Sequence, residues 1–246
     1  MQFGQGWDDA DPDSAVPNLD ATLEEIRRHD ADLILLQEVE HAQDGGRQID
    51  PPPNFTRLKA GLPGYDSWFA YPKEDFRELP FGIGLAIFSR TPLTSRTRVD
   101  IPSPPIEFDF FGKKTTPTDR VMIGARTVLQ GREVQVYNVH LLAFFMLGSS
   151  HKVHHEQVDL VADLLGKSRI PTILAGDFNV KNHEVLIERF EARGYKTVQR
   201  EQATWRRRPY VLDHIFHNGT IQCLRKSVEP TMASDHHALV ADLEFA

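Results

Sequence analysis

Short apolar runs that end on polar residues recur along the chain. Residues 33–36 are Leu-Ile-Leu-Leu and lead into Gln37 and Glu38, and the run 173–175 is bounded by Pro171 and Gly176. Apolar runs of this length between turn residues are typical of strands buried on both faces. Related patterns predict further strands at 65–71, 82–89, 120–129, 133–140, 211–216 and 238–245.

Apolar residues at helical spacing lie between several of these strands. They predict helices at 19–29 with Asn18 as N-cap, at 54–62, from His151 to about 165, and at 183–193, where Gly194 ends the helix. Gln130 and Gly131 predict a hairpin turn between two of the strands. Strands that alternate with helices in this way predict an α/β fold.

Composition narrows the class of protein. A chain of 246 residues can form one domain with a substantial core, and its formal net charge of -7 implies no general surface for polyanions. The single cysteine, Cys223, excludes an internal disulfide and a cysteine-based zinc cluster. The sequence has no long apolar run and no signal-peptide pattern at its start, so we expect a cytoplasmic location without a transmembrane segment.

Polar residues follow the predicted strands where each of them ends. Strand ends in an open sheet collect ligands, so such groups are expected to converge at one rim. Clustered carboxylates repel one another unless a cation lies between them, and hard oxygen ligands favour Mg²⁺ or Mn²⁺ over zinc. The residues concerned are Glu38, Asn138 with His140, Asp177 with Asn179, and Asp235 with His236, with Asp213 inside a further strand.

Several of these features also have plainer interpretations. Asp177 and Asn179 would point the same way from an extended strand, or they could form an Asx turn before the next helix. The run 206–208, Arg-Arg-Arg, is either a solvated loop or a phosphate contact. The phenylalanines of 108–111 are expected to pack their loop onto the body, and His151, His154 and His155 to lie on a solvated helix face.

Five short motifs, in this order, resemble the endonuclease/exonuclease/phosphatase superfamily, the fold of deoxyribonuclease I. They are Leu-Gln-Glu at 36–38, Asn-Val-His-Leu at 138–141, Gly-Asp-Phe-Asn at 176–179, Leu-Asp-His-Ile at 212–215 and Ser-Asp-His-His at 234–237. The resemblance spans nearly the whole chain. It implies a four-layered α/β sandwich, in which two packed and mainly antiparallel sheets are flanked by helices, and a single domain over residues 1–246.

The resemblance also implies roles for the acidic residues and the amide. Glu38 matches the main metal ligand of the family, and Asp177 matches the residue that orients or deprotonates the attacking water. Asn179 would hold the phosphate or the attacking group. Asp213 would orient a histidine or serve a structural role. Asp235 would support both the neighbouring His236 and the metal region.

The two histidines complete the implied site. His236 would hydrogen-bond the scissile phosphate as an acid or base, and His140 would lie near the leaving group. Mg²⁺, or Mn²⁺ in its place, is the implied cofactor. Physically, metal and imidazoles would neutralise charge that develops on the phosphoryl oxygens while Asp177 activates water.

The start of the sequence departs from the family pattern. Members of the family begin with a strand that ends in an asparagine beside the metal-binding glutamate, followed by a segment similar to Gln2, Phe3 and Gly4. We therefore expect this chain to lack its usual first strand and one residue near the metal, and the natural protein to begin upstream.

The expected function is a metal-dependent phosphoesterase that hydrolyses phosphodiesters or phosphomonoesters with activated water. A nuclease acting on DNA or RNA would need a basic groove, for which 206–208, Arg120, Lys113 and Lys114 are candidates. A phospholipid-headgroup phosphodiesterase would use Phe144, Phe145 and Met146 as an apolar rim. A catalytically weakened binding module of the same fold is the remaining alternative, and no obligate protein partner is evident.

Overall fold

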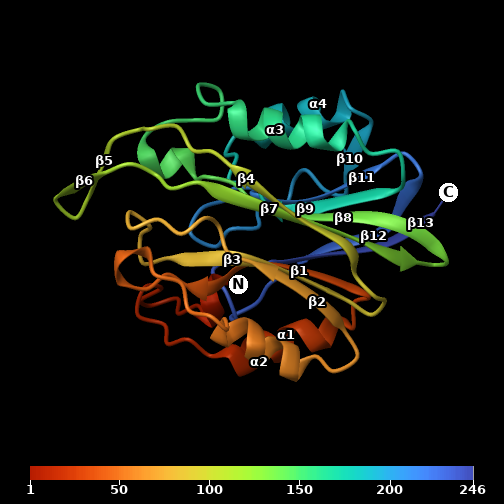
Figure 1. The fold of residues 1–246 in the computed structure, drawn as a ribbon, viewed down its shortest axis with the longest axis horizontal. Coiled ribbons are helices and arrows are strands. Elements are labelled where there is room, and N and C mark those ends of the chain that lie inside the picture. The colour runs from red at the N-terminus through yellow and green to blue at the C-terminus, as the bar shows by residue number, and fades with distance from the viewer. Residues whose placement is uncertain (246) are drawn as a thin grey trace.

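The computed structural model describes residues 1–245, and its elements lie in four layers (Figure 1). Helices α1 (Leu19–His29) and α2 (Pro53–Gly61) cover one sheet, and α3 (Glu156–Leu165) and α4 (His183–Glu191) cover the other. Short 3-10 helices occupy Gln2–Gly4, Asp44–Gly46 and Phe144–Leu147. The four-layered sandwich is therefore confirmed.

The strands form two stacked sheets and two hairpins. The first sheet has the antiparallel order β1 (Leu33–His41), β3 (Gly82–Ser89) and β2 (Asp66–Ala70). In the six-stranded second sheet, β8 and β9 are parallel and the other neighbours are antiparallel. Its order is β10 (Tyr195–Thr197), β11 (Asp213–Asn218), β9 (Thr172–Asp177), β8 (Arg132–His140), β7 (Arg120–Leu129) and β4 (Thr94–Ile101). The hairpins pair β5 (Phe108–Phe110) with β6 (Lys113–Thr115), and β12 (Ile221–Glu229) with β13 (Ala238–Phe245).

Local sequence signals account for much of this arrangement. The Asn18 side chain accepts a hydrogen bond from the amide of Ala21 at 3.2 Å, which confirms it as the N-cap of α1. Gln130 and Gly131 turn the β7–β8 hairpin with φ of 49° and 77°, the left-handed values that a tight hairpin requires. The core lies between the sheets and beneath the helices, where Phe88, Phe178, Phe190 and Phe216 are fully buried.

Three sequence expectations are wrong in detail. The helix expected from His151 begins only at Glu156, and the rings of His151 and His154 pack against Phe144 at 4.5 and 5.1 Å instead of facing solvent from a helix. Phe111 does not pack onto the body but is 95% exposed at the tip of the β5–β6 hairpin. The expected burial of residues 33–36 on both faces holds only for Ile34, because one edge of β1 borders a cleft.

The strands β4, β6, β10 and β12 were not predicted. Strand β4 is mostly exposed, with Arg96, Arg98 and Asp100 among its eight residues, so it lacks the apolar alternation that marks a half-buried strand. Pairing with β7 stabilises it instead. None of the helices within residues 1–245 is long and apolar enough to span a membrane.

His214 should make the stability of the fold depend on pH. Its ring is buried against Phe178 and Phe216, and its Nδ1 lies 3.2 Å from the Thr197 hydroxyl. Burial, and secondarily the charge of His183, lower the pKa of His214 to about 4. The unfolded chain binds the proton near pH 6.5 and the folded chain only near pH 4, so stability is complete above pH 6.5 and is lost as the pH falls.

We expect acidification from pH 7 to pH 4 to cost the native protein about 3 kcal/mol more than it costs the His214→Phe variant. Urea unfolding of both proteins at pH 7, 5.5 and 4 measures the difference. Parallel stability curves across that range would contradict a buried neutral His214.

Candidate active site

Three neighbouring strands of the second sheet bring three titratable side chains into one row. In the parallel pair β8–β9, His140 lies opposite Asp177, and in the antiparallel pair β9–β11, Asp177 lies opposite Asp213. Side chains in one row of a sheet point to the same face. The structure therefore gathers His140, Asp177 and Asp213 at the strand ends, as the sequence predicted, although Asp213 begins β11 and does not lie inside it.

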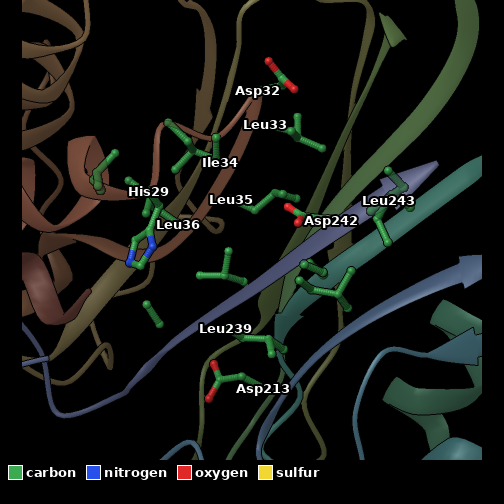
Figure 2. A pocket seen from close by; sticks show the side chains of 18 of the residues that line it. His29, Asp32, Leu33, Ile34, Leu35, Leu36, Asp213, Leu239, Asp242 and Leu243 are labelled. Carbon is green, nitrogen blue, oxygen red and sulfur yellow. The ribbon is translucent and has the colours of Figure 1, made fainter. Parts of the chain in front are cut away.

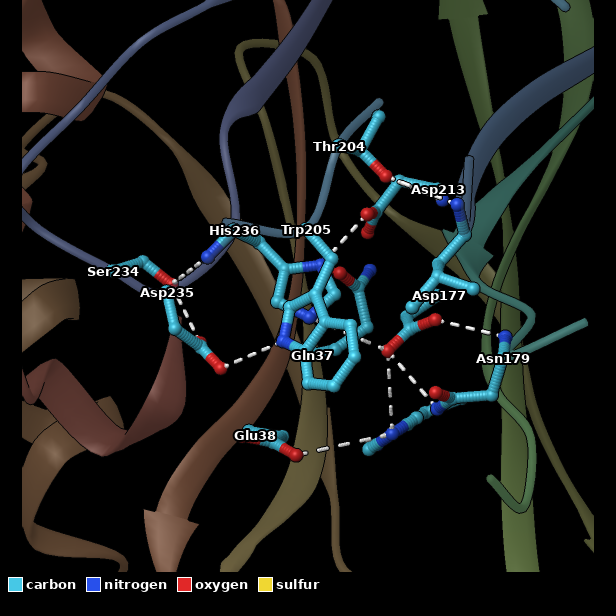
Figure 3. Close-up of polar contacts among 12 residues, drawn as sticks. Gln37, Glu38, Asp177, Asn179, Thr204, Trp205, Asp213, Ser234, Asp235 and His236 are labelled. Atoms are coloured by element: carbon cyan, nitrogen blue, oxygen red, sulfur yellow. Dashed lines mark hydrogen bonds and ion pairs between the residues drawn. The ribbon is translucent and has the colours of Figure 1, made fainter. Parts of the chain in front are cut away.

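Glu38 reaches this row from the first sheet. Strand β1 has a bulge between Gln37 and Glu40, and Glu38 within it has a φ of 54°, which is rare for a residue with a side chain. A Cβ on Gly82 would lie only 2.4 Å from the Cβ of Glu38, so the neighbouring strand needs glycine at that position. The bulge aims the carboxylate at the second sheet, where its Oε1 lies 3.9 Å from His140 Nε2 (Figure 3).

Asp177 and Asn179 are held together by a turn. The Asn179 amide donates to Asp177 Oδ1 at 2.8 Å, and Asn179 Nδ2 donates to Asp177 Oδ2 at 3.0 Å and to the Leu141 carbonyl at 3.0 Å. This is an Asx turn, one of the two conformations expected from the sequence. It places the carboxylate of Asp177 beside the side-chain amide of Asn179. Phe178 between them is fully buried and contacts Phe190 and Phe216, so it anchors the turn in the core.

His236 lies between two carboxylates and is hydrogen-bonded to one of them. Its Nδ1 lies 2.7 Å from Asp213 Oδ2, and its Nε2 lies 3.9 Å from Asp177 Oδ2 (Figure 3). Burial alone would lower the pKa of His236, but Asp213, Asp177 and Asp235 raise it to about 10. Burial by itself would raise the pKa of Asp213. The imidazolium of His236 more than offsets this effect and leaves the pKa of Asp213 below its ordinary value. His236 is therefore a cation and Asp213 its anion at neutral pH.

The other members of the row are pushed toward their neutral forms. Burial, with the charge of Asp213, raises the pKa of Asp177 well above its ordinary value. Burial and the nearby Arg120 lower the pKa of His140 to about 3, so its imidazole is neutral. Burial and Asp235 raise the pKa of Glu38 to about 7. An acid with a raised pKa beside a neutral imidazole and an imidazolium is an arrangement suited to proton transfer.

The charge of Asp235 acts on both Glu38 and His236, while its side-chain oxygens lie against other groups. Its Oδ2 accepts the Trp205 indole N–H at 3.1 Å, and its Oδ1 is 3.4 Å from the Ser234 hydroxyl. Trp205 is a site residue that the sequence analysis missed, although it directly precedes the arginine run. Thr204 was also missed: its buried hydroxyl accepts from the Leu212 and Asp213 amides at 3.1 and 3.0 Å and fixes the start of β11.

The carboxylates of Glu38 and Asp235 suit a hard divalent cation in an open site. No group of three His, Cys, Asp or Glu side chains within residues 1–245 is already arranged to hold a metal ion. Mg²⁺ is usually bound by only one or two carboxylates, with water and substrate phosphate as its other ligands. Burial, and secondarily the charge of Asp235, raise the pKa of Glu38, and a cation between the two carboxylates would relieve the repulsion that Glu38 meets there.

The arginine run is largely neutralised within the chain. Arg206 Nη2 lies 3.3 Å from Asp9 and Arg207 Nη2 lies 2.6 Å from Asp13, and both guanidinium groups stack on Trp7 at 5.1 and 5.5 Å. An acidic N-terminal loop therefore covers these arginines, which leaves less positive charge for a nucleic acid.

The apolar segment after β8 is also mostly covered. Phe144 is fully buried, and Phe145 packs on Trp205 and Tyr210 with ring centroids 5.7 Å from each. Met146 alone of the three candidates for an apolar rim is exposed. This part of the chain closes one side of the site and offers little area to a lipid surface.

Comparisons with known proteins bear on the family and the fold. A model of the Endonuclease/Exonuclease/phosphatase family matches residues 2–236. A UPF0294 protein of Yersinia pseudotuberculosis is 33% identical over 122 residues, which is 46% of this chain and 44% of that protein. The matched region thus spans less than half the length of this curated relative.

Solved structures share the fold at low sequence identity. An endonuclease/exonuclease/phosphatase from Beutenbergia cavernae has a TM-score of 0.70 and 21% identity, covering 99% of this chain and 69% of its own. A mannosyl-6-phosphatase of Bacteroides thetaiotaomicron has a TM-score of 0.64 and 19% identity, covering 92% of this chain and 90% of its own. At these identities the likeness establishes the fold.

Proposed function

Because the chain belongs to the endonuclease/exonuclease/phosphatase family, we propose that it is a metal-dependent phosphoesterase that hydrolyses phosphodiesters or phosphomonoesters with an activated water. The observation that carries the proposal is the continuous row Glu38, His140, Asp177, His236 and Asp213, in which successive side chains lie 2.7 to 3.9 Å apart. Burying charges of both signs costs free energy of folding, and groups with perturbed pKa values cluster at functional sites.

Asp177 is the proposed base. Asn179 donates to both sides of this carboxylate, through its backbone amide and its side-chain amide, and so fixes its plane. The raised pKa of Asp177 brings the carboxylate closer to the pH at which it works, so that it can take a proton from the attacking water. Neutral His140, 3.7 Å from Asp177 Oδ2, lies on the other side as a hydrogen-bond partner for substrate or water.

His236 is the proposed donor to the phosphoryl group. Asp213 holds its Nδ1, which leaves Nε2 facing the site with a proton to donate to a phosphoryl oxygen. Arg120 adds a second cation, since its charge acts on both His140 and Glu38 and its buried Nε has no hydrogen-bond partner within the described residues.

Glu38 and Asp235 would hold the divalent ion, which would supply Lewis-acid polarisation of the phosphoryl oxygen and neutralise developing charge. The Trp205 indole orients Asp235 by occupying one of its oxygens. The other oxygen has only a weak contact at 3.4 Å and is available as a ligand.

Small phosphate esters are the proposed substrates, in preference to duplex DNA or a membrane lipid. The net charge is -7, and the arginines 206 and 207 are paired with Asp9 and Asp13. The buried Phe144 and packed Phe145 leave no broad apolar rim in this part of the described chain. One solved structure of this fold is a mannosyl-6-phosphatase, which is consistent with a small phosphomonoester.

Hydrolysis of p-nitrophenyl phosphate and bis-p-nitrophenyl phosphate tests the proposal. We expect turnover with Mg²⁺ or Mn²⁺ to fall at least about 100-fold in EDTA and to return when Mg²⁺ is added in excess. The relative rates on the two esters then decide between phosphatase and phosphodiesterase activity. An equal rate in EDTA would refute metal dependence, and no turnover on either ester would favour the binding module.

Metal binding is measured separately from turnover. Calorimetric titration with Mg²⁺ should show at least about tenfold weaker binding for Glu38→Gln than for the native chain. Glu133→Gln, at an exposed position on β8, is the matched control and should bind as the native chain does.

A further inference from the structure

Asn138 is a polar residue of β8 that has no part in the proposed reaction. It is fully buried in the middle of the second sheet, where Ile123 of β7 and Ala175 of β9 lie opposite it. Side chains two positions apart in a strand point to the same face, so Asn138 and His140 both point toward the first sheet. Burying an amide is costly unless its hydrogen bonds are made, so the partners of Asn138 indicate what it does.

Both polar atoms of the Asn138 side chain bind the first sheet. Its Nδ2 donates to the carbonyl oxygens of Leu36 and Ala86, each at 2.9 Å, and its Oδ1 accepts from Gln37 Nε2 at 2.6 Å. Leu36 and Ala86 lie opposite one another in the β1–β3 pair, so a single amide joins both of these strands to β8. A buried network whose hydrogen bonds are all made fixes one relative position of the groups that it joins.

These hydrogen bonds lie directly beside the bulge that holds Glu38. Leu36 and Gln37 are the last two regularly paired residues of β1 before the register shifts. On β8, His140 follows Asn138 by two residues, and its Nε2 lies 3.9 Å from Glu38 Oε1. The same amide therefore fixes the two strand ends from which these facing side chains project.

Strand pairing does not fix β1 against the second sheet. Among the described residues β1 pairs with β3, and its other edge borders a cavity of about 620 Å³ that Gln37 also lines. Figure 2 shows Leu33 and Leu35 of β1 beside this cavity. Side chains must therefore hold β1 in place over the second sheet, and Asn138 contributes three hydrogen bonds at the end where Glu38 lies.

We propose that Asn138 is a positioning residue, which sets the place of the Glu38 carboxylate relative to His140 and thereby the affinity of the site for its divalent ion. The inference rests on the proposed function, in which Glu38 is a metal ligand. Asn138 acts through the two strands and not by contact with the reacting groups. Because a displacement of about 1 Å in a reactive group can cost about 100-fold in rate, fixing the strand ends is sufficient for this role.

Calorimetric titration with Mg²⁺ tests this proposal. Asn138→Leu removes the amide but keeps a buried side chain of similar size, and Gln135→Leu is its matched control. Gln135 is also a buried amide of β8, but its Nε2 donates to the carbonyls of Ala125 and Val136, within the second sheet. We expect Mg²⁺ to bind at least about tenfold more weakly to Asn138→Leu and within about twofold of the native affinity to Gln135→Leu, although both variants should melt at a lower temperature.

Hydrogen exchange of the metal-free proteins, measured by mass spectrometry, gives a second readout. Amides of 36–41 should exchange at least about tenfold faster in Asn138→Leu than in the native chain, whereas Gln135→Leu should leave them unchanged. Gln37→Leu removes only one of the three hydrogen bonds and keeps the test decisive if Asn138→Leu does not fold. It should weaken Mg²⁺ binding at least about threefold.

Two results would overturn the proposal. Equally weakened Mg²⁺ binding in Asn138→Leu and Gln135→Leu would mean that any loosening of β8 has this effect, and native affinity or native exchange of 36–41 in Asn138→Leu would mean that the amide does not hold Glu38. Neither readout needs turnover, so a chain that binds Mg²⁺ but cleaves neither ester would refute the proposed function alone. If the native chain bound no Mg²⁺, the proposed function would fail, and faster exchange of 36–41 would still support the position that Asn138 gives to Glu38.

Discussion

Asp177→Asn is expected to reduce ester hydrolysis at least about 10³-fold while leaving the protein folded. The substitution keeps the shape of the side chain but removes the proposed base from the water. It also removes a buried carboxyl group whose ionisation is opposed by burial and by the charge of Asp213, so the melting temperature should change by only a few degrees. Steady-state rates at saturating Mg²⁺, with circular dichroism melting curves, measure the two effects.

Asp163→Asn is the matched control for this experiment. Asp163 lies on α3, its side chain is 63% exposed, and it pairs with Arg193 on the surface. Its neutralisation should leave turnover within about twofold of the native rate, because exposed ion pairs contribute little. If Asp177→Asn keeps more than a tenth of the native rate, another group deprotonates the water and the proposed role is wrong.

Gly176→Ala is expected to destabilise the fold by at least about 4 kcal/mol, or to prevent folding. Gly176 has a φ of 155°, and a Cβ there would lie 1.9 Å from the carbonyl oxygen of Val139. That oxygen belongs to the backbone of the parallel partner β8, so neither strand can move aside without breaking the β8–β9 pairing. Urea unfolding curves measure the loss.

Gly131→Ala separates this steric clash from simple backbone strain. Gly131 also has a positive φ, 77°. A methyl group on Gly131 would have no atom of the described chain within 4 Å, apart from its neighbours in the sequence. The cost there should be only about 1 to 2 kcal/mol, the ordinary penalty of a left-handed residue with a side chain. Similar losses in the two variants would mean that the parallel strands separate easily at Gly176.

The sequence predicted the strand ends best, for a physical reason. Apolar runs such as 173–175 can only be buried, so the polar residues that follow them must lie at the rim of the sheets, and Asp177 and His140 do. The family motifs then indicated which of these polar residues belong to one site. The expectation that the chain lacks its usual first strand stays a prediction.

Other site features depend on contacts between distant segments, which local pattern does not contain. The bulge that turns Glu38 inward needs Gly82 on the neighbouring strand, 44 positions away. Trp205 joins the site only because a bridge pairs it with His236. The arginine run could be interpreted as solvated or as phosphate-binding, and its pairing with Asp9 and Asp13 depends on a contact across almost the whole chain.

The register of β9 has a consequence for how this protein can diversify. Asp177 and Asn179 face the site while Phe178, between them, is locked into the core against Phe190 and Phe216. A single deletion in β9 would exchange the two environments and destroy the reaction chemistry and the core together. Change in substrate choice is therefore expected in connecting segments that hold none of these groups, such as 143–155, which can vary in length and composition while the reactive groups keep their spacing.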